Sequence, residues 1–299
     1  MIYEFAAEPE VMVTWEHFHV IWNGTGASQG RLLVEYPQSW RKQTYALADK
    51  LSPAVRANAI CSRLSDPEQR HRLVGSGGRP YDPRRGGWLA NAVADHGPGR
   101  GFRAVAARQV IAGCSPVVAA DDVEGETALW KAERQDKACP RRAAEMCQHV
   151  RTLLCHSSVM VLVDRFFDPC EPRFTRPFGQ FVRVHTGWRR LELHTSRRGS
   201  FRRDIQQANY RSKLEPTVPS GADLVVCFWP DLPATARMHP RFVLTERGGV
   251  HFDVGLDEGP GTALVSLLEH EVFLQFWKDY HPNSQVFGSR EVATVSGLG

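Results

Sequence analysis

Residues 158–164, with the sequence SVMVLVD, are the stretch that most constrains the fold of this chain. The run is apolar and rich in β-branched residues, and it ends on a carboxylate at Asp164. Such a run is typical of a strand buried on both faces of a sheet. Two further strand-like runs follow at 190–195 and 223–229, with helical segments between them. This alternation predicts an α/β protein (α+β overall) in which residues 157–299 form a mixed sheet flanked by helices.

Residues 1–156 are expected to form a separate, mainly helical unit whose role the sequence does not indicate. Trp15, Phe18 and Trp22 are spaced three and four residues apart, which predicts a helix with an aromatic core face. Thr14 could cap that helix and Gly24 could end it. The glycine-rich loop that begins at residue 75 has no Gly-Lys-Ser/Thr after it, so we predict no P-loop.

Polar residues stand where the predicted parallel strands end. Ligands of open α/β sheets bind at the carboxyl ends of the strands. Asp164 and His194 lie at two such ends, and His239 and Arg241 follow the third strand. We therefore interpret Asp164 and His194 as candidate phosphate-binding or nucleic-acid-binding residues. For Asp164, an equally good interpretation is a carboxylate that caps the next turn.

Residues 239–257 are predicted to form a β-hairpin with its turn at Glu246-Arg247-Gly248-Gly249. Alternation places His239 and Arg241, with Val243 and Thr245, on one face of the first strand, and His251 and Asp253 on the polar face of the second. The polar faces of the pair are expected to gather an imidazole, a guanidinium and a carboxylate. That combination suits a phosphodiester, because imidazole can attack phosphorus and guanidinium can bind its oxygens. The alternative is a polar face exposed to water.

Arginine dominates the basic residues of this chain. Of 37 basic residues six are lysine and 31 are arginine, and the net charge is +4. The predicted helix 197–211 lies beside the strand ends and favours a nucleic-acid partner, because arginine binds phosphate in a bidentate manner. Its candidate phosphate ligands are Arg197, Arg198, Arg202 and Arg203. A GC-rich genome also enriches arginine, so composition permits such a partner without establishing it.

The cysteine content points to a reducing compartment. Seven cysteines, an odd number scattered over 299 residues, fit reduced thiols in a cytoplasm. Cys139, Cys147, His149 and Cys155 raise the alternative of zinc, but no C-x-x-C pair occurs. We expect buried free thiols, no metal and no cofactor. The chain has no apolar run of ~18–20 residues and no signal peptide, so we expect a cytoplasmic protein without a membrane partner.

The order of parts in residues 157–282 resembles the phospholipase D-like superfamily. The parts are VMVLVDRFFDP, LELHTS, ADLVVCFWPD and MHPRFVLTERGGVHFDVGLDEG. The resemblance is to the small single-motif branch that includes the domain found after MIT domains. It implies His239 as the histidine of an H-x-K motif, Arg241 in the lysine position and Asp257 as a third candidate catalytic residue. Thr245 lies near the usual place of the motif aspartate, and residues 255–257 replace the later Ser/Asn element.

Two functions follow from the resemblance. The first is a bacterial phospholipase D-like protein that acts on nucleic acid, in phage defence or on a mobile element. In this family two motif copies meet face to face and need no metal, so one His239 from each chain of a homodimer would be required. The second function is a non-catalytic module that recognises a phosphate-bearing ligand or a partner protein within a larger assembly. The departures at Thr245 and at residues 255–257 favour the second function.

Overall fold

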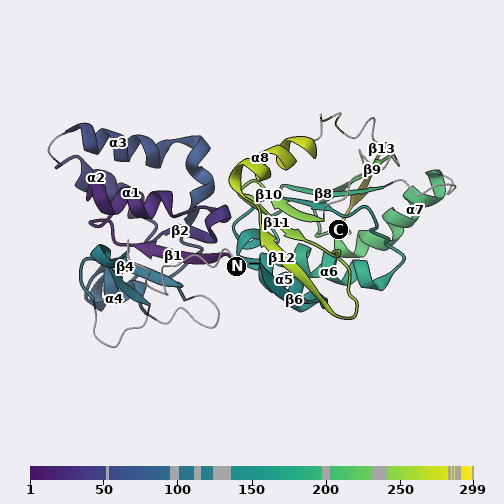
Figure 1. Ribbon diagram of the computed structural model, residues 1–299, viewed down its shortest axis with the longest axis horizontal. Helices are drawn as coiled ribbons and strands as arrows, with labels where there is room; N and C mark the ends of the chain where they lie inside the picture. Colours follow the sequence, from purple (N-terminus) through teal and green to yellow (C-terminus); the bar gives the residue numbers. More distant parts are fainter. Residues whose placement is uncertain are drawn as a thin grey trace. The chain divides into compact units, whose positions relative to one another are not determined.

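The computed structural model describes residues 1–51, 54–94, 101–110, 116–123, 136–196, 203–230, 241–281, 284, 286 and 291–297. The chain divides into two compact units, of which one is Ile2–Glu133 and the other is Arg134–Gly299 together with Met1. Each unit combines a sheet with helices, so the predicted α/β class is confirmed (Figure 1).

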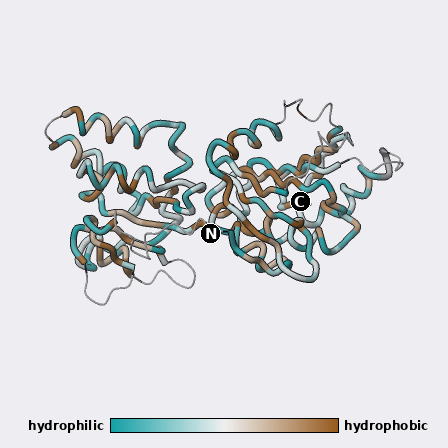
Figure 2. Tube along the Cα trace, in the orientation of Figure 1, coloured by the Kyte–Doolittle hydropathy of each residue, from teal (hydrophilic) through white to brown (hydrophobic). Residues whose placement is uncertain are grey.

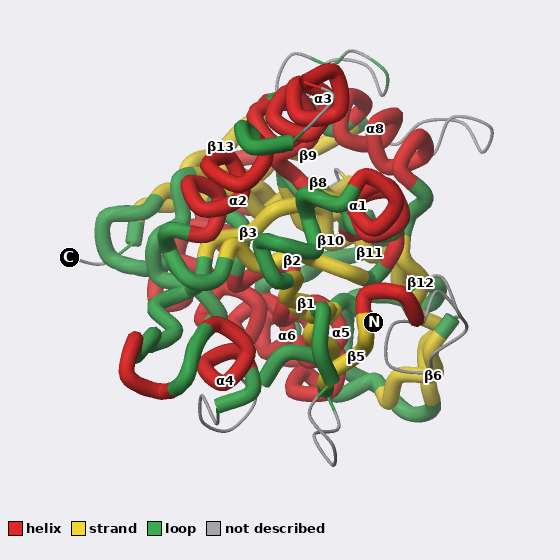
Figure 3. The backbone as a smooth tube through the Cα atoms, turned by 90° about the vertical axis from the view of Figure 1, so that its left-hand side faces the viewer, coloured by secondary structure: helices red, strands yellow, loops and turns green. Residues whose placement is uncertain are grey.

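The N-terminal unit is built on a five-stranded sheet with the order β3-β2-β1-β4-β5, and neighbouring strands in it pair in parallel. The strands are β1 (Tyr3–Ala7), β2 (Arg31–Glu35), β3 (Leu73–Gly75), β4 (Ala104–Ala107) and β5 (Val117–Ala119). The α-helices are α1 (Trp15–Asn23), α2 (Trp40–Ala48), α3 (Ala54–Ser65) and α4 (Trp88–Ala92). Figures 1 and 3 show α1, α2 and α3 on one side of this sheet and α4 on the other.

The predicted aromatic helix is confirmed as α1. Phe18 and Trp22 are buried, and their rings stack with centroids 5.5 Å apart. Thr14 occupies the N-cap position without a side-chain hydrogen bond, and Gly24 follows the last turn. The parallel sheet, however, differs from the mainly helical unit expected over residues 1–156. Its strands are three to five residues long, and apolar runs that short cannot be told from turns of buried helix by their periodicity.

The C-terminal unit is built on an eight-stranded mixed sheet with the order β13-β9-β8-β7-β10-β11-β12-β6. The strands are β6 (Lys137–Pro140), β7 (Val159–Val163), β8 (Arg190–Ser196), β9 (Asp223–Trp229), β10 (Phe242–Thr245), β11 (Gly248–Phe252), β12 (Thr262–Leu267) and β13 (Glu291–Ser296). The α-helices are α5 (Ala143–Cys155), α6 (Pro172–Arg183), α7 (Arg203–Leu214) and α8 (His270–Asp279).

The three apolar runs singled out from the sequence form the centre of this sheet, as predicted. Strands β7, β8 and β9 pair in parallel, and the other neighbouring strands of the sheet pair antiparallel. The boundary between the two units lies before β6 rather than at the expected position, 156/157. The reason is that β6 pairs with β12 and α5 packs on α6, so residues 137–155 complete the C-terminal sheet and its helical layer.

Helices cover both faces of the C-terminal sheet. Helix α8 lies on one face, and α5 and α6 lie on the other (Figure 1). One buried cluster joins α8 to the sheet. It contains Phe273 of α8, Val161 and Val163 of β7, and Phe242 of β10. Hydrophobic residues follow the central strands of this unit (Figure 2). The strand alternation thus supplies two apolar faces, as expected of a sheet covered on both sides.

The hairpin is confirmed, but its polar residues do not share a face. The register pairs Phe242 with His251 and Val243 with Val250, so His251 lies beside Phe242, with ring centroids 5.4 Å apart. Arg241, one residue before Phe242, belongs to the opposite face because side chains alternate along a strand. Burial lowers the pKa of the His251 imidazole, and the charges of Asp253 and Arg241 also act on it, so the three groups are near one another although Arg241 is on the other face. His239, the other imidazole of the predicted group, lies outside the described residues. The turn at residues 246 and 247 sets this register.

Residues 262–282 do not form the single closing helix that their composition suggests. Their first part is β12, which pairs with both β11 and β6, and only α8 is helical. Ala263 and Val265 are buried while Thr262 and Leu264 are exposed, which is the alternation of a strand with one covered face. Among the described residues, no helix has the length and apolar character that crossing a bilayer requires.

Candidate functional site

Two loops meet at the carboxyl end of β7 and are joined by Asp164. The Asp164 carboxylate accepts the backbone N–H of Phe166 at 2.9 Å through Oδ1 and that of Leu256 at 3.1 Å through Oδ2. The loop after β7 and the loop between β11 and β12 are therefore held together by one side chain. We call the residues of these two loops, 164–170 and 253–258, the β7 edge.

Asp164 itself is hidden from any ligand. Only 1% of its surface is exposed, and burial raises the pKa of its carboxyl group. The two backbone N–H groups and Arg241 oppose that rise, while Asp257 adds to it. The expected contact of Asp164 with phosphate is therefore corrected: its carboxylate caps the turn that follows β7. An aspartate fits this position because its short side chain reaches backbone donors two residues on.

Asp257 and Glu258 hold three arginines in place at the same edge. Asp257 lies 2.6 Å from Nη2 of Arg141 and 3.5 Å from Nη1 of Arg173. Glu258 accepts the backbone N–H of Ala143 at 2.9 Å and lies 3.2 Å from Arg176. The carboxylate of Asp257 is thus engaged by two guanidiniums, which is an anchoring role. The sequence had suggested a catalytic one.

Phe166 is the exposed aromatic residue of the β7 edge. Its exposed fraction is 46%, whereas Phe167 next to it is buried. The guanidinium carbons of Arg165 and Arg241 lie 4.8 Å and 5.3 Å from the centroid of the Phe166 ring. These distances are those of cation–π contacts. The triplet Arg165-Phe166-Phe167 was visible in the sequence, but only the structure shows which phenylalanine reaches the surface.

Arg241 keeps hydrogen-bonding capacity for a ligand. Its Nη1 donates to the carbonyl oxygen of Asp253 at 3.5 Å, the outer limit for such a bond. Its Nε is buried and has no hydrogen-bond partner within the described part of the chain. A guanidinium has five N–H donors, so most of those of Arg241 are uncommitted among these residues. Arg241, which the sequence predicts as a candidate catalytic residue, thus lies beside Phe166 at the β7 edge.

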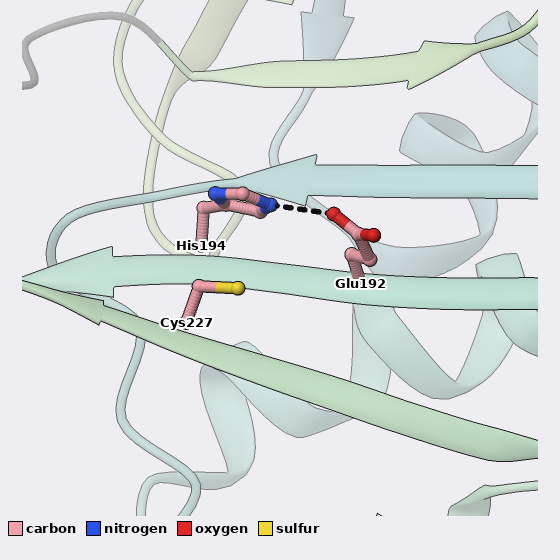
Figure 4. A group of neighbouring side chains, drawn as sticks. All are labelled: Glu192, His194 and Cys227. Carbon is pink, nitrogen blue, oxygen red and sulfur yellow. Dashed lines mark hydrogen bonds and ion pairs between the residues drawn. The ribbon is translucent and has the colours of Figure 1, made fainter. Parts of the chain in front are cut away.

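His194 lies on β8 beside the end of β7, where its carbonyl oxygen accepts the backbone N–H of Asp164 at 3.0 Å, but its side chain is completely buried. Its Nδ1 accepts the indole N–H of Trp229 at 3.0 Å, and its Nε2 lies 2.9 Å from Oε2 of Glu192 (Figure 4). Because indole N–H can only donate, Nδ1 must be an acceptor and the proton must lie on Nε2. Both ring nitrogens are committed within the core. The expected role of His194 in binding phosphate is therefore corrected to one in core packing.

Glu192, His194 and Cys227 form the one cluster in the described residues with the composition of a metal site. Their potential ligand atoms lie within 4.8 Å of one another, and all three residues are buried. A metal ligand must offer a lone pair, and the hydrogen bonds of His194 occupy both of its nitrogens. Glu192 also lies 3.1 Å from Nε of Arg190. The arrangement is therefore a buried hydrogen-bond and ion-pair network between β8 and β9.

Four predicted site residues lie outside the described part of the chain: His239, Arg197, Arg198 and Arg202. Arg203 is the first residue of α7. Of the predicted residues that are described, the structure brings Asp164, Arg241 and Asp257 to one edge, and it buries the side chain of the neighbouring His194 in the core. Comparison with known proteins assigns no family, since no family model, no curated protein and no solved structure matches the chain.

Proposed function

We propose that the C-terminal unit binds nucleic acid at the β7 edge. The observation that carries this proposal is Phe166, an exposed aromatic ring flanked by the guanidiniums of Arg165 and Arg241. Nucleic-acid-binding proteins combine aromatic rings that stack on bases with cations that bind phosphates. The edge also follows the carboxyl end of a parallel strand, where ligands of α/β sheets bind.

Two carboxylates of this edge, Asp164 and Asp257, are not available to repel an anionic ligand. The carboxylate of Asp164 is capped by backbone N–H groups and does not face solvent. Asp257 is neutralised by Arg141 and Arg173. The side chain of Arg173 remains 55% exposed although it is paired with Asp257. Asp253 is exposed and Asp168 is half-buried, so the accessible part of the edge carries acidic as well as basic groups, with Arg165 and Arg241 at the Phe166 ring.

Binding of a fluorescent oligonucleotide to the full chain tests this proposal. Base stacking on an aromatic side chain contributes about 1–3 kcal/mol, so Phe166→Ala should weaken binding roughly fivefold or more. Arg241→Ala should also weaken binding and should reduce its dependence on salt. Leu274→Ala is a matched control, because Leu274 is 44% exposed on α8. Equal affinities for the wild type, Phe166→Ala and Arg241→Ala would reject the proposal.

Hydrolysis of the bound phosphodiester is an extension of this proposal. It rests on the resemblance to phospholipase D-like proteins and on His239, acting across a homodimer. The engagement of Asp257 by two arginines favours the alternative, a module that recognises a phosphate-bearing ligand or a partner without cleaving it. Incubating labelled DNA and RNA with the protein distinguishes the two, because only the first yields shortened products.

A further inference from the structure

A groove between α5 and α6 continues from the β7 edge. It has a volume of about 570 Å³ and is open to solvent. Its basic lining residues are Arg142 before α5, Arg176 and Arg183 on α6, and Lys213 on α7. Two carboxylates, Glu145 and Glu258, also line it. Four cations against two anions leave this α5–α6 groove with positive charge.

Helix α6 presents a row of arginines to solvent. Arg173, Arg176 and Arg183 are all exposed, and their spacing of three and then seven residues places them on one helix face. The opposite face of α6 is buried through Phe174, Phe178 and other apolar residues. At 1.5 Å per residue, the row spans about 15 Å along the helix axis. The three arginines therefore form a linear array of charges, and the packed helix α6 holds their backbone positions fixed.

The groove and the β7 edge are held together by consecutive residues. Asp257 is paired with Arg173 at the edge, and Glu258 is paired with Arg176 in the groove. Glu258 also accepts the first backbone N–H of α5, which fixes that helix beside α6. The β7 edge and the groove therefore meet at two neighbouring residues, Asp257 and Glu258.

The four cations that line the groove differ in how far carboxylates of the protein neutralise them. Arg142 and Arg176 are partly neutralised, since they lie 3.9 Å from Glu145 and 3.2 Å from Glu258. Arg183 and Lys213 form no ion pair within the described part of the chain. Both side chains are exposed. Their charges are best balanced by an anion from outside the protein.

We infer that the α5–α6 groove binds the sugar-phosphate backbone of a single-stranded nucleic acid, one of whose bases stacks on Phe166. This inference rests on the function proposed above and adds the class of nucleic acid. A single strand is favoured because its unpaired bases can stack on a protein ring, whereas bases within a duplex already stack on one another. A linear array of about 15 Å suits a chain of phosphates better than one lipid headgroup. The apolar face of α6 is also buried and cannot insert into a bilayer.

The test measures fluorescence anisotropy of the full chain with a single-stranded oligonucleotide and with its duplex, over a range of salt concentrations. The double variant Arg176→Ala/Arg183→Ala should weaken binding of the single strand roughly tenfold or more. It should also reduce the salt slope by about 0.7 for each phosphate that the protein no longer neutralises, or about 1.4 in all. The control Arg84→Ala/Arg189→Ala removes the same charge from two other exposed arginines and should bind like the wild type.

Two further measurements distinguish a direct loss of binding from a loss of folded structure. Arg176→Ala removes the partner of Glu258, so its thermal unfolding and circular dichroism are compared with those of the wild type. Arg183→Ala alone disturbs no ion pair among the described residues and should still weaken binding and lower the salt slope by about 0.7.

Three results would overturn the inference, and they separate it from the proposal on which it rests. If Phe166→Ala weakens binding but the arginine variants do not, the edge binds nucleic acid and the groove does not. If the duplex binds as tightly as the single strand, the assignment to single strands is wrong. If no oligonucleotide binds the wild type, the proposed function fails as well. In that case, loss of binding to vesicles with anionic lipid in the arginine variants would assign the groove to a membrane surface.

Discussion

Asp164 and Leu256 are joined by a hydrogen bond across 92 residues of sequence, from the backbone N–H of Leu256 to Oδ2 of Asp164 at 3.1 Å. This bond brings the loop between β11 and β12 to the end of β7. It thereby brings Asp257, with its two arginines, close to Asp164, whose pKa the charges of Asp257 and Arg241 both affect. The proposed ligand surface depends on a carboxylate that the ligand never touches.

The first prediction concerns the pH dependence of stability through Asp164. Burial raises the pKa of its carboxyl group in the folded state. The folded state therefore holds this proton at pH values where the unfolded chain has lost it, and the contribution of Asp164 declines as pH rises through the folded pKa. We compare the unfolding free energy of the wild type with that of Asp164→Asn. The difference, wild type minus variant, should fall as pH rises from the unfolded to the folded pKa of Asp164. Chemical denaturation at a series of pH values measures it, and a difference that rises with pH would contradict the raised pKa.

The second prediction concerns His194. Replacing it by alanine removes the hydrogen bonds from His194 to Trp229 and to Glu192 and takes a fully buried ring out of the core. His194→Ala should lower the unfolding free energy by about 3 kcal/mol or more. Oligonucleotide affinity of the folded fraction should not change, because the imidazole is fully buried. His19→Ala, on the exposed side of α1, is the control.

Zinc provides a separate test of the same cluster. The unfolding midpoint of the wild type should not rise when Zn²⁺ is added, because both nitrogens of His194 are committed to hydrogen bonds. A rise that His194→Ala abolishes would show that a metal displaces these bonds, and the network would then have to be described as a metal site.

The third prediction concerns thiol reactivity. Burial raises the pKa of Cys139 and of Cys147 to about 11, so few thiolates form near neutral pH. Cys155 and Cys170 are exposed. In native protein, iodoacetamide should modify Cys155 and Cys170 first and leave Cys139 and Cys147 largely unmodified, as mass spectrometry of peptides would show. Rapid modification of Cys139 would mean that β6 opens readily.

The fourth prediction concerns the hydrolytic extension. If the protein cleaves labelled DNA or RNA, His239→Ala should remove nearly all cleavage, because the resemblance assigns the phosphohistidine to that residue. Arg241→Lys should keep part of the activity, since the charge survives while the bidentate geometry is lost. EDTA should have no effect on this reaction. Cleavage that persists in His239→Ala would show that another group attacks phosphorus, and loss of cleavage in EDTA would point to a metal.

The apolar runs of the sequence determined the central strands of the C-terminal sheet. β7, β8 and β9 were predicted because several consecutive β-branched and apolar residues are satisfied only by burial on both faces. The aromatic spacing that forms α1 and the turn residues of the β10–β11 hairpin are also local signals. By contrast, β12 lies in a run whose composition also fits a helix. It forms a strand because it pairs with β11 on one side and with β6 on the other.

The candidate site required the tertiary structure. The sequence placed polar residues at strand ends, but burial depends on which neighbours cover each side chain. His194 is enclosed by Trp229, Glu192 and Tyr280, whereas Phe166 reaches solvent only three residues after the end of a buried strand. The register of the hairpin put His251 beside Phe242 and not on the face of Arg241. Local sequence thus determined the strands and helices. Which side chains meet at the surface was decided by long-range contacts such as that of Asp164 with Leu256, because these contacts join segments that no local pattern relates.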